Sequence, residues 1–182
     1  MKKVLFVVGS TRKESFHRQL AEFLKGEVEK TGNAAEILNY EGLPFFSQDI
    51  EFPTPEVVKN IRSKFAESDA LWILSPEYNG SYSGTLKNLL DWVSRPVDPA
   101  VQGAPEFIKG KPVTISGAAG RSKAAFVIEN LKNLATYMGF KVAANNSGIN
   151  IPGESWGTNV LVLGEEEKAL LTKQVEDFIK EL

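Results

Sequence analysis

Apolar and polar residues follow two alternating rhythms along this chain. Short uninterrupted apolar runs, such as residues 4–8 and 70–74, are typical of strands that are buried on both faces. Between these runs, apolar residues recur every three or four positions, as they do on one face of a helix. The pattern therefore predicts strands at 4–8, 34–38, 70–74, 112–116 and 141–144, and helices at 15–30, 56–67, 83–94, 122–138 and 165–182.

This alternation indicates an α/β fold, because strand–helix–strand units build a parallel sheet with helices on both faces. Residues 96–112 carry proline and glycine and form a longer connection than is usual inside a compact domain. The rhythm resumes after them, so we interpret them as a surface excursion rather than a linker. Residues 145–159 are rich in Asn, Gly and Pro, and no strand or helix is predicted there. A chain of 182 residues is expected to form a single domain, residues 1–182.

Composition excludes several kinds of chemistry. The absence of cysteine excludes disulfides, iron–sulfur clusters, thiolate zinc sites and cysteine nucleophiles, and no clustered histidines suggest another metal site. The 21 basic and 23 acidic residues leave a net charge of −2, which gives no electrostatic reason to expect nucleic acid or a membrane surface as partner. No apolar run is as long as a signal peptide or a membrane span, so we expect a soluble cytoplasmic protein.

Two loops carry the candidate chemistry, and each follows a predicted buried strand. Ligands of open α/β sheets bind at the carboxyl ends of the strands. Residues 9–15 combine a glycine, hydroxyl groups and an arginine, which together can bind a phosphate. In residues 75–81, Tyr78 can cover a flat ring and the amides around Asn79 and Gly80 can meet its polar edge. Either loop alone could be an ordinary turn, but together they point to flavin mononucleotide, FMN.

Other motifs do not compete with these loops. The small residues at 116–120 could admit the edge of a ligand or could let a helix pack on the sheet. The glycine fingerprints of dinucleotide-binding and nucleotide-phosphate loops are absent. Residues 153–157 match Gly-x-Ser-x-Gly, but a nucleophile elbow needs a later histidine and His17 is the only one. No set of side chains can perform acid–base or nucleophilic catalysis, so no catalytic residue is predicted and a cofactor would carry the reaction.

At these loops the chain resembles the NADPH-dependent FMN reductase family, which includes chromate, quinone and azo-dye reductases. Residues 9–17 and 75–92 carry the resemblance, which extends over most of the chain. It implies a flavodoxin-like three-layer fold around a five-stranded parallel sheet of order 2-1-3-4-5, with FMN between strands one and three. It also implies cofactor contacts by Ser10, Thr11, Arg12, Ser15 and His17 at the phosphate, by Pro76, Glu77, Tyr78, Asn79, Gly80 and Ser81 along the ribityl chain and ring, and by Ser116 and Gly117 near the far edge of the ring.

One departure from the family concerns His17, where the family usually has asparagine. A neutral histidine could donate a hydrogen bond to the phosphate, and a protonated one would bind it better. This hypothesis predicts that FMN affinity weakens as the pH rises through the histidine range.

The resemblance implies ping-pong hydride transfer from NAD(P)H, through FMN, to an acceptor such as a quinone, an azo compound, a metal oxyanion or free flavin. It also implies a homodimer or homotetramer, in which Trp92 is a candidate contact with the partner subunit or, alternatively, a partly buried core residue. The alternative function is a flavodoxin-like electron carrier that does not react with NAD(P)H. Such carriers are usually strongly acidic and lack an arginine at the position of Arg12.

Overall fold

The strands form one parallel sheet with the order β2-β1-β3-β4-β5. This is the flavodoxin-like order 2-1-3-4-5, and the predicted α/β class is confirmed. The computed structural model describes all residues, 1–182. The strands are β1 (Lys3–Val8), β2 (Ala34–Ile37), β3 (Ala70–Pro76), β4 (Pro112–Ala119), β5 (Lys141–Val142) and β6 (Ser147–Asn150).

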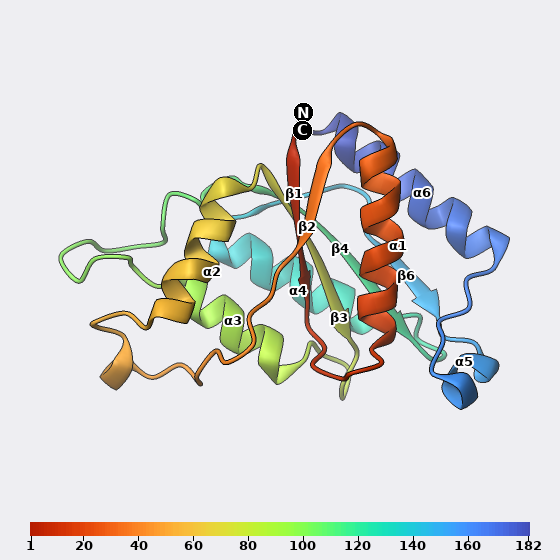
Figure 1. Cartoon of the computed structure of the whole chain (residues 1–182), viewed down its shortest axis with the longest axis horizontal. Coiled ribbons are helices and arrows are strands. Elements are labelled where there is room, and N and C mark those ends of the chain that lie inside the picture. Colours follow the sequence, from red (N-terminus) through yellow and green to blue (C-terminus); the bar gives the residue numbers. More distant parts are fainter.

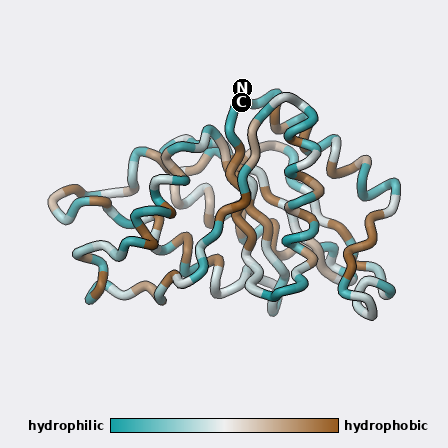
Figure 2. The backbone as a smooth tube through the Cα atoms, in the orientation of Figure 1, coloured by the Kyte–Doolittle hydropathy of each residue, from teal (hydrophilic) through white to brown (hydrophobic).

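Helices cover both faces of the sheet and complete three layers (Figure 1). Helices α1 and α6 pack on one face, and α2, α3 and α4 pack on the other. The strands between them are strongly hydrophobic, whereas the outer turns of the helices are polar (Figure 2). The helices are α1 (Phe16–Lys30), α2 (Glu56–Glu67), α3 (Gly84–Ser94), α4 (Ala125–Met138), α5 (Gly153–Thr158) and α6 (Glu165–Lys180), with a 3-10 turn at Gln48–Ile50.

The two central strands, β1 and β3, send alternate side chains to opposite faces of the sheet. Leu5 and Leu71 join the core beneath α2, α3 and α4, while Phe6 and Trp72 join the core beneath α1 and α6. The Phe6 and Trp72 rings stack with centroids 5.4 Å apart, and Phe178 of α6 meets Trp72 edge-on at 5.6 Å. Burial of each aromatic side chain contributes about 2–3 kcal/mol, so this packing stabilises the central pair of strands, β1 and β3.

The fifth position of the sheet differs from the prediction of one strand. Both β5 and β6 pair in parallel with β4, and residues 143–146 separate them. At this break the Asn146 side-chain oxygen accepts a hydrogen bond from the Ile115 amide at 2.9 Å, so a side chain replaces a backbone partner. Residues 145–159, for which the sequence predicted no element, contain β6 and α5. The Asn and Gly residues of this segment are poor strand formers and masked β6 in the sequence.

The structure confirms the prediction for residues 96–112 but not the one for Trp92. Residues 96–112 form a surface excursion that reaches outward beside α2, as predicted (Figure 1). Trp92, however, is fully buried, and its indole nitrogen donates to the Pro44 carbonyl at 2.8 Å. The suggestion that Trp92 contacts a partner subunit is therefore wrong.

None of the helices combines the length and the apolar character that a membrane crossing requires.

Candidate cofactor site

The β1–α1 loop begins at a glycine that permits close packing between chain segments. The Gly9 amide donates to the Leu74 carbonyl at 2.6 Å, where β1 meets the end of β3. A Cβ atom at Gly9 would lie 3.0 Å from both the Leu86 Cβ and the Ser83 Oγ. The Ser83 hydroxyl also donates to the Gly9 carbonyl. Glycine therefore lets the β1–α1 loop lie directly against the start of α3.

The same loop ends in the N-terminus of α1, which is arranged to bind an anion. Ser15 caps the helix, because its hydroxyl accepts a hydrogen bond from the Arg18 amide at 3.2 Å. The amides of Phe16 and His17, in the first turn, donate to no atom of the protein. Free amides and the helix dipole together favour a negatively charged group at this position.

The guanidinium group of Arg12 lies beside this helix terminus. It donates to the Asn159 side chain at 3.1 Å and to the Glu14 carbonyl. It also lies 4.6 Å from the centre of the Phe16 ring, where a cation–π contact adds to its placement. Arg12 is therefore held in place by neighbours from its own loop and from the segment after α5, which sequence reasoning did not include in the site.

The β3–α3 loop forms a tight turn that presents an aromatic ring. The backbones of Tyr78 and Ser81 are paired by hydrogen bonds of 2.8 and 3.0 Å. Between them, Asn79 and Gly80 both have positive φ, 52° and 72°, which is the Asn-Gly geometry of a type I′ turn. The Tyr78 side chain is 56% exposed. The turn thus holds a tyrosine ring at the carboxyl edge of the sheet without burying it.

Helix α4 holds this turn at two points. The Glu77 carboxylate accepts hydrogen bonds from the amides of Phe126 and Val127, both at 3.1 Å, at an α4 N-terminus that has no other side-chain cap. One turn later, the Asn130 side chain donates to the Gly80 carbonyl at 2.8 Å. Glu77 is therefore engaged with α4, and the position of the turn depends on α4.

At the end of β4, the two predicted ring contacts belong to the core. The Ser116 hydroxyl accepts from the Trp72 indole at 3.0 Å and donates to the Gln174 side chain at 2.9 Å, and it is inaccessible to solvent. A Cβ atom at Gly117 would lie 2.6 Å from the Ala124 Cβ, so this glycine lets α4 pack on the sheet. Of the two uses of small residues left open by the sequence, the structure supports helix packing at Gly117.

His17 occupies a different environment from the one expected. It is buried, its Nε2 accepts a hydrogen bond from the Ala118 amide at 3.0 Å, and its ring also bonds to the backbone of Ser75. Burial lowers the pKa of His17 to about 4, because the charged ring would lose its hydration. A protonated His17 at the phosphate is therefore not supported. The neutral ring instead ties α1 to the ends of β3 and β4.

A cavity of about 170 Å³ lies where the three loops meet. Trp156 of α5 forms one wall, 56% exposed, and meets the Phe16 ring edge-on at 5.1 Å. Thr11 lines a neighbouring larger cavity instead. Asn79, Gly80, Ser81, Ser116 and Gly117 do not line the small cavity. Its lining comprises the predicted residues Ser10, Arg12, Ser15, His17, Pro76, Glu77 and Tyr78. Ala118, Ala119 and Gly120, from the small-residue loop that the sequence left open as a ligand edge, also line it, as do Phe16, Ile151 and Trp156, which were not among the predicted contacts.

The segment that supplies Trp156 contains the Gly-x-Ser-x-Gly match rejected from the sequence. Ser155 lies inside α5 and is fully buried, and its hydroxyl accepts a hydrogen bond from the Val162 amide at 3.0 Å. It cannot act as an exposed nucleophile. The sequence signal that could have revealed this wall was the tryptophan within the motif, rather than the serine.

Residues 2–150 match the model of the family described as NADPH-dependent FMN reductase. The chain belongs to this family. As an NADPH-dependent FMN reductase family member, it is an oxidoreductase of the NAD(P)H-dependent flavin and quinone reductase class. The matched range contains the β1–α1, β3–α3 and β4–α4 loops, whereas α5 and Trp156 lie beyond it.

Relatives of this family member include a 2-hydroxy-1,4-benzoquinone reductase from Burkholderia, which is 37% identical over 75% of this chain and 71% of the relative. An NAD(P)H-dependent FMN reductase from Pseudomonas aeruginosa is 34% identical over 64% of this chain and 63% of the relative. Among solved structures, the flavoenzyme NAD(P)H:(acceptor) oxidoreductase FerB from Paracoccus denitrificans superposes with a TM-score of 0.84 at 29% identity, over 99% of this chain and 96% of that one.

The residues of the small cavity have the chemistry that the family cofactor requires. A phosphate needs several N–H and O–H donors and a positive charge, and the α1 terminus supplies free amides beside Arg12. A flavin ring needs a flat apolar contact, and Tyr78 and Trp156 supply exposed aromatic surface at the same edge. The donor set therefore fits FMN.

Proposed function

We propose that the protein binds FMN in the small cavity and uses NAD(P)H to reduce a small-molecule acceptor, with quinones as the favoured class. One observation carries the proposal: free amides at the α1 N-terminus lie beside Arg12, next to an exposed tyrosine turn at the same edge of the sheet. Bound FMN supplies the hydride and electron transfer. The names of the relatives, a benzoquinone reductase and an FMN reductase among them, support this acceptor class.

In this proposal the chain's own residues bind and orient, and none transfers a proton. Ser10, Arg12 and Ser15 hold the phosphate, together with the amides of Phe16 and His17. Pro76, Tyr78 and the turn that follows support the ribityl chain and the ring. Glu77, the one carboxylate in the cavity lining, is occupied by the amides of α4 and acts in positioning.

The small cavity is too small to cover a whole flavin ring, which supports a reaction in two steps and a second subunit beside the site. The cavity of about 170 Å³ is smaller than the ~300–1,000 Å³ of typical ligand pockets, so part of the ring would remain uncovered. One open face can receive NAD(P)H first and the acceptor afterwards, which is a ping-pong sequence. A second subunit would shield the uncovered part, so we propose a homodimer or homotetramer, to be measured by light scattering.

A visible spectrum with and without NAD(P)H tests the function. The purified protein, supplied with FMN, is expected to show a bound-flavin spectrum that NADPH or NADH bleaches under anaerobic conditions. Absence of flavin binding would contradict the proposal, and bound flavin that neither nucleotide bleaches would indicate an electron carrier.

The variant Arg12→Ala tests the phosphate contact. We expect it to weaken FMN binding by about 10- to 100-fold, because a hydrogen bond to a charged group contributes about 1.5–3 kcal/mol. Lys168→Ala on α6 is a matched control, since it removes the same charge from an exposed i,i+3 pair far along the chain. Equal FMN affinity in both variants would exclude Arg12 from the phosphate site.

A further inference from the structure

A second and larger cavity lies on the other side of the β1–α1 loop. Its volume is about 540 Å³, within the ~300–1,000 Å³ range of small-molecule sites. The loop after β2 and the start of α3 form its other walls. It shares Ser10 and Arg12 with the small cavity, so the two cavities adjoin across this loop.

The charged groups around this cavity are mainly cationic. Arg12, Lys13 and Arg18 line it, against a single carboxylate, that of Glu41. Arg12 already bonds within the protein, and Arg18 pairs with Glu22 at 3.2 Å. Lys13 has no carboxylate within ion-pair distance. An unpaired lysine on a loop rim, with an arginine nearby, is suited to a phosphate ester.

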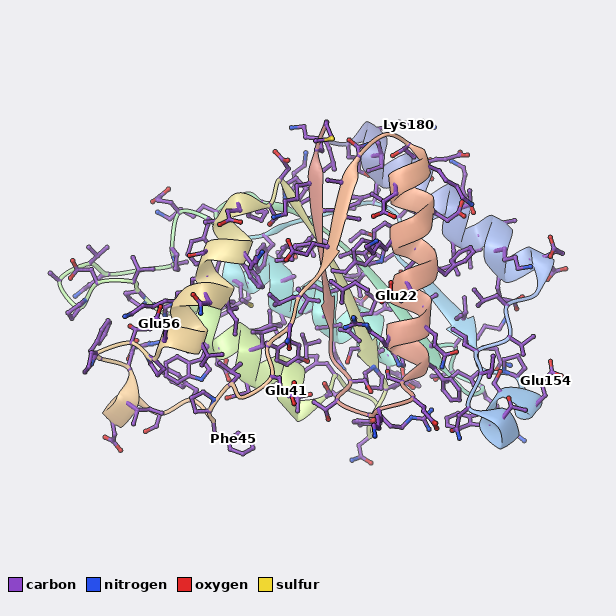
Figure 3. The ribbon with its side chains drawn as sticks, viewed as in Figure 1. Glu22, Glu41, Phe45, Glu56, Glu154 and Lys180 are labelled. Carbon is purple, nitrogen blue, oxygen red and sulfur yellow. The ribbon has the colours of Figure 1, made fainter.

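The opposite wall offers an apolar and aromatic surface. Phe45 is 83% exposed, and Figure 3 shows its ring extended away from the ribbon. The loop that carries it is nevertheless well held, because Asn88 accepts from the Phe46 amide at 2.7 Å and donates to the Pro44 carbonyl at 2.9 Å. A loop fixed in this way presents its aromatic ring at low entropic cost, and such a ring can stack on a flat heterocycle.

We propose that this cavity binds the adenosine phosphate half of NAD(P)H. Lys13 and Arg18 would contact a phosphate, and Phe45 would stack on the adenine. The nicotinamide end would then reach across the shared residues Ser10 and Arg12 toward the flavin in the small cavity. This inference rests on the proposed function, because it assigns a subsite to the co-substrate of that reaction.

Dead-end inhibition of the FMN-loaded protein tests the subsite. Adenosine 2′,5′-bisphosphate and 5′-ADP, which lack the nicotinamide, are expected to inhibit competitively against NADPH without releasing flavin. Stronger inhibition by the 2′,5′-bisphosphate assigns the cations to the 2′-phosphate, and equal inhibition assigns them to the pyrophosphate. Failure of both to inhibit, or inhibition that tracks flavin release, would overturn the proposal.

Variants distinguish this subsite from the flavin site. Lys13→Ala and Phe45→Ala are each expected to raise the inhibition constant of the probe and the KM for NADPH by about tenfold, the effect of one lost charged hydrogen bond or stacking contact. FMN affinity and the KM for the acceptor should not change. Lys173→Ala, an exposed i,i+4 ion-pair partner on α6, is the control and should match wild type.

The two possible failures give different results. Suppose that flavin binds and NADPH bleaches it, but that Lys13→Ala and Phe45→Ala have the same inhibition constant for the probe and the same KM for NADPH as wild type. The subsite is then wrong and the reductase function stands. If wild type binds no flavin, the proposed function itself fails. Phe45→Tyr keeps the stacking surface and should restore the KM for NADPH, which separates stacking from a change in the fold of the loop.

Discussion

The buried histidine predicts a specific loss of stability in acid. Burial lowers the pKa of His17 from 6.5 to about 4 in the folded protein, while the unfolded chain keeps the ordinary value. Between these two pH values the unfolded state binds more protons than the native state, so stability falls as the pH falls. This contribution is fully present above pH 6.5 and is lost through pH 4. The shift corresponds to about 3 kcal/mol, since each pKa unit is worth about 1.4 kcal/mol.

Urea denaturation at several pH values between 7.5 and 4.5 measures this effect. His17→Asn is the reference variant, because asparagine can accept the Ala118 hydrogen bond but does not titrate in this range. The stability difference between wild type and variant should move in favour of the variant by about 2–3 kcal/mol over the interval. All other titrating groups are common to both proteins and cancel in the difference.

Two results would refute this reasoning. A stability difference that stays constant from pH 7.5 to 4.5 would mean that His17 is not held neutral by burial. An FMN affinity that weakens as the pH rises from 6 to 8 would mean that a charged His17 binds the phosphate. The structure predicts no weakening of FMN affinity caused by His17 in that range, because the pKa of about 4 keeps His17 neutral throughout.

Three further predictions concern positions with sharp steric or hydrogen-bond requirements. Gly148→Ala should lower the free energy of unfolding, measured with urea, by at least about 2 kcal/mol, because the new Cβ would lie 1.9 Å from the Lys123 carbonyl oxygen. Gly26→Ala, at a position in α1 with open space, should raise it by about 0.5–1 kcal/mol. Similar values for both variants would contradict this prediction. Asn130→Ala removes the hydrogen bond to the Gly80 carbonyl and should weaken FMN binding a few-fold, as measured by fluorescence titration. Asn133→Ala, at an exposed position on the same helix, should leave FMN binding unchanged. Equal effects of the two variants would mean that this hydrogen bond does not position the turn for FMN. Ser116→Ala should lower the free energy of unfolding by about 1–3 kcal/mol, since it leaves Trp72 and Gln174 without their buried hydrogen-bond partner. It should leave FMN affinity unchanged. Weaker FMN binding by this variant would indicate that Ser116 contacts the cofactor.

The elements that the sequence predicted well are those with a strong local pattern. The uncharged run of β3 is buried along its whole length, and the helical spacing of α1 matches its buried face. The β1–α1 loop could be identified as a candidate phosphate site because glycine, hydroxyls and Arg12 are neighbours in the chain. By contrast, β6 has only four residues and includes glycine and asparagine, so no run of apolar residues marked it.

For the candidate site, too, local features could be predicted from the sequence and features that depend on distant segments could not. The presence of Tyr78, Asn79 and Gly80 in one turn, and their place after a buried strand, were determined by the sequence, because turn chemistry depends on adjacent residues. Whether a side chain faces the cavity or the core was decided only by tertiary packing. His17 and Ser116 have polar groups suited to a ligand, but they are satisfied by Ala118 and by Trp72 and Gln174 inside the protein.

The sequence by itself thus determined the fold class, the strand order through a family resemblance, and the two loops that are the candidates for cofactor binding. Only the tertiary structure brought Trp156 against Phe16, attached Asn159 to Arg12, and formed a second cavity beside the β1–α1 loop. The physical reason is that secondary structure and turns follow from local preferences. Burial, hydrogen-bond partners and pKa depend on which distant segments exclude water together.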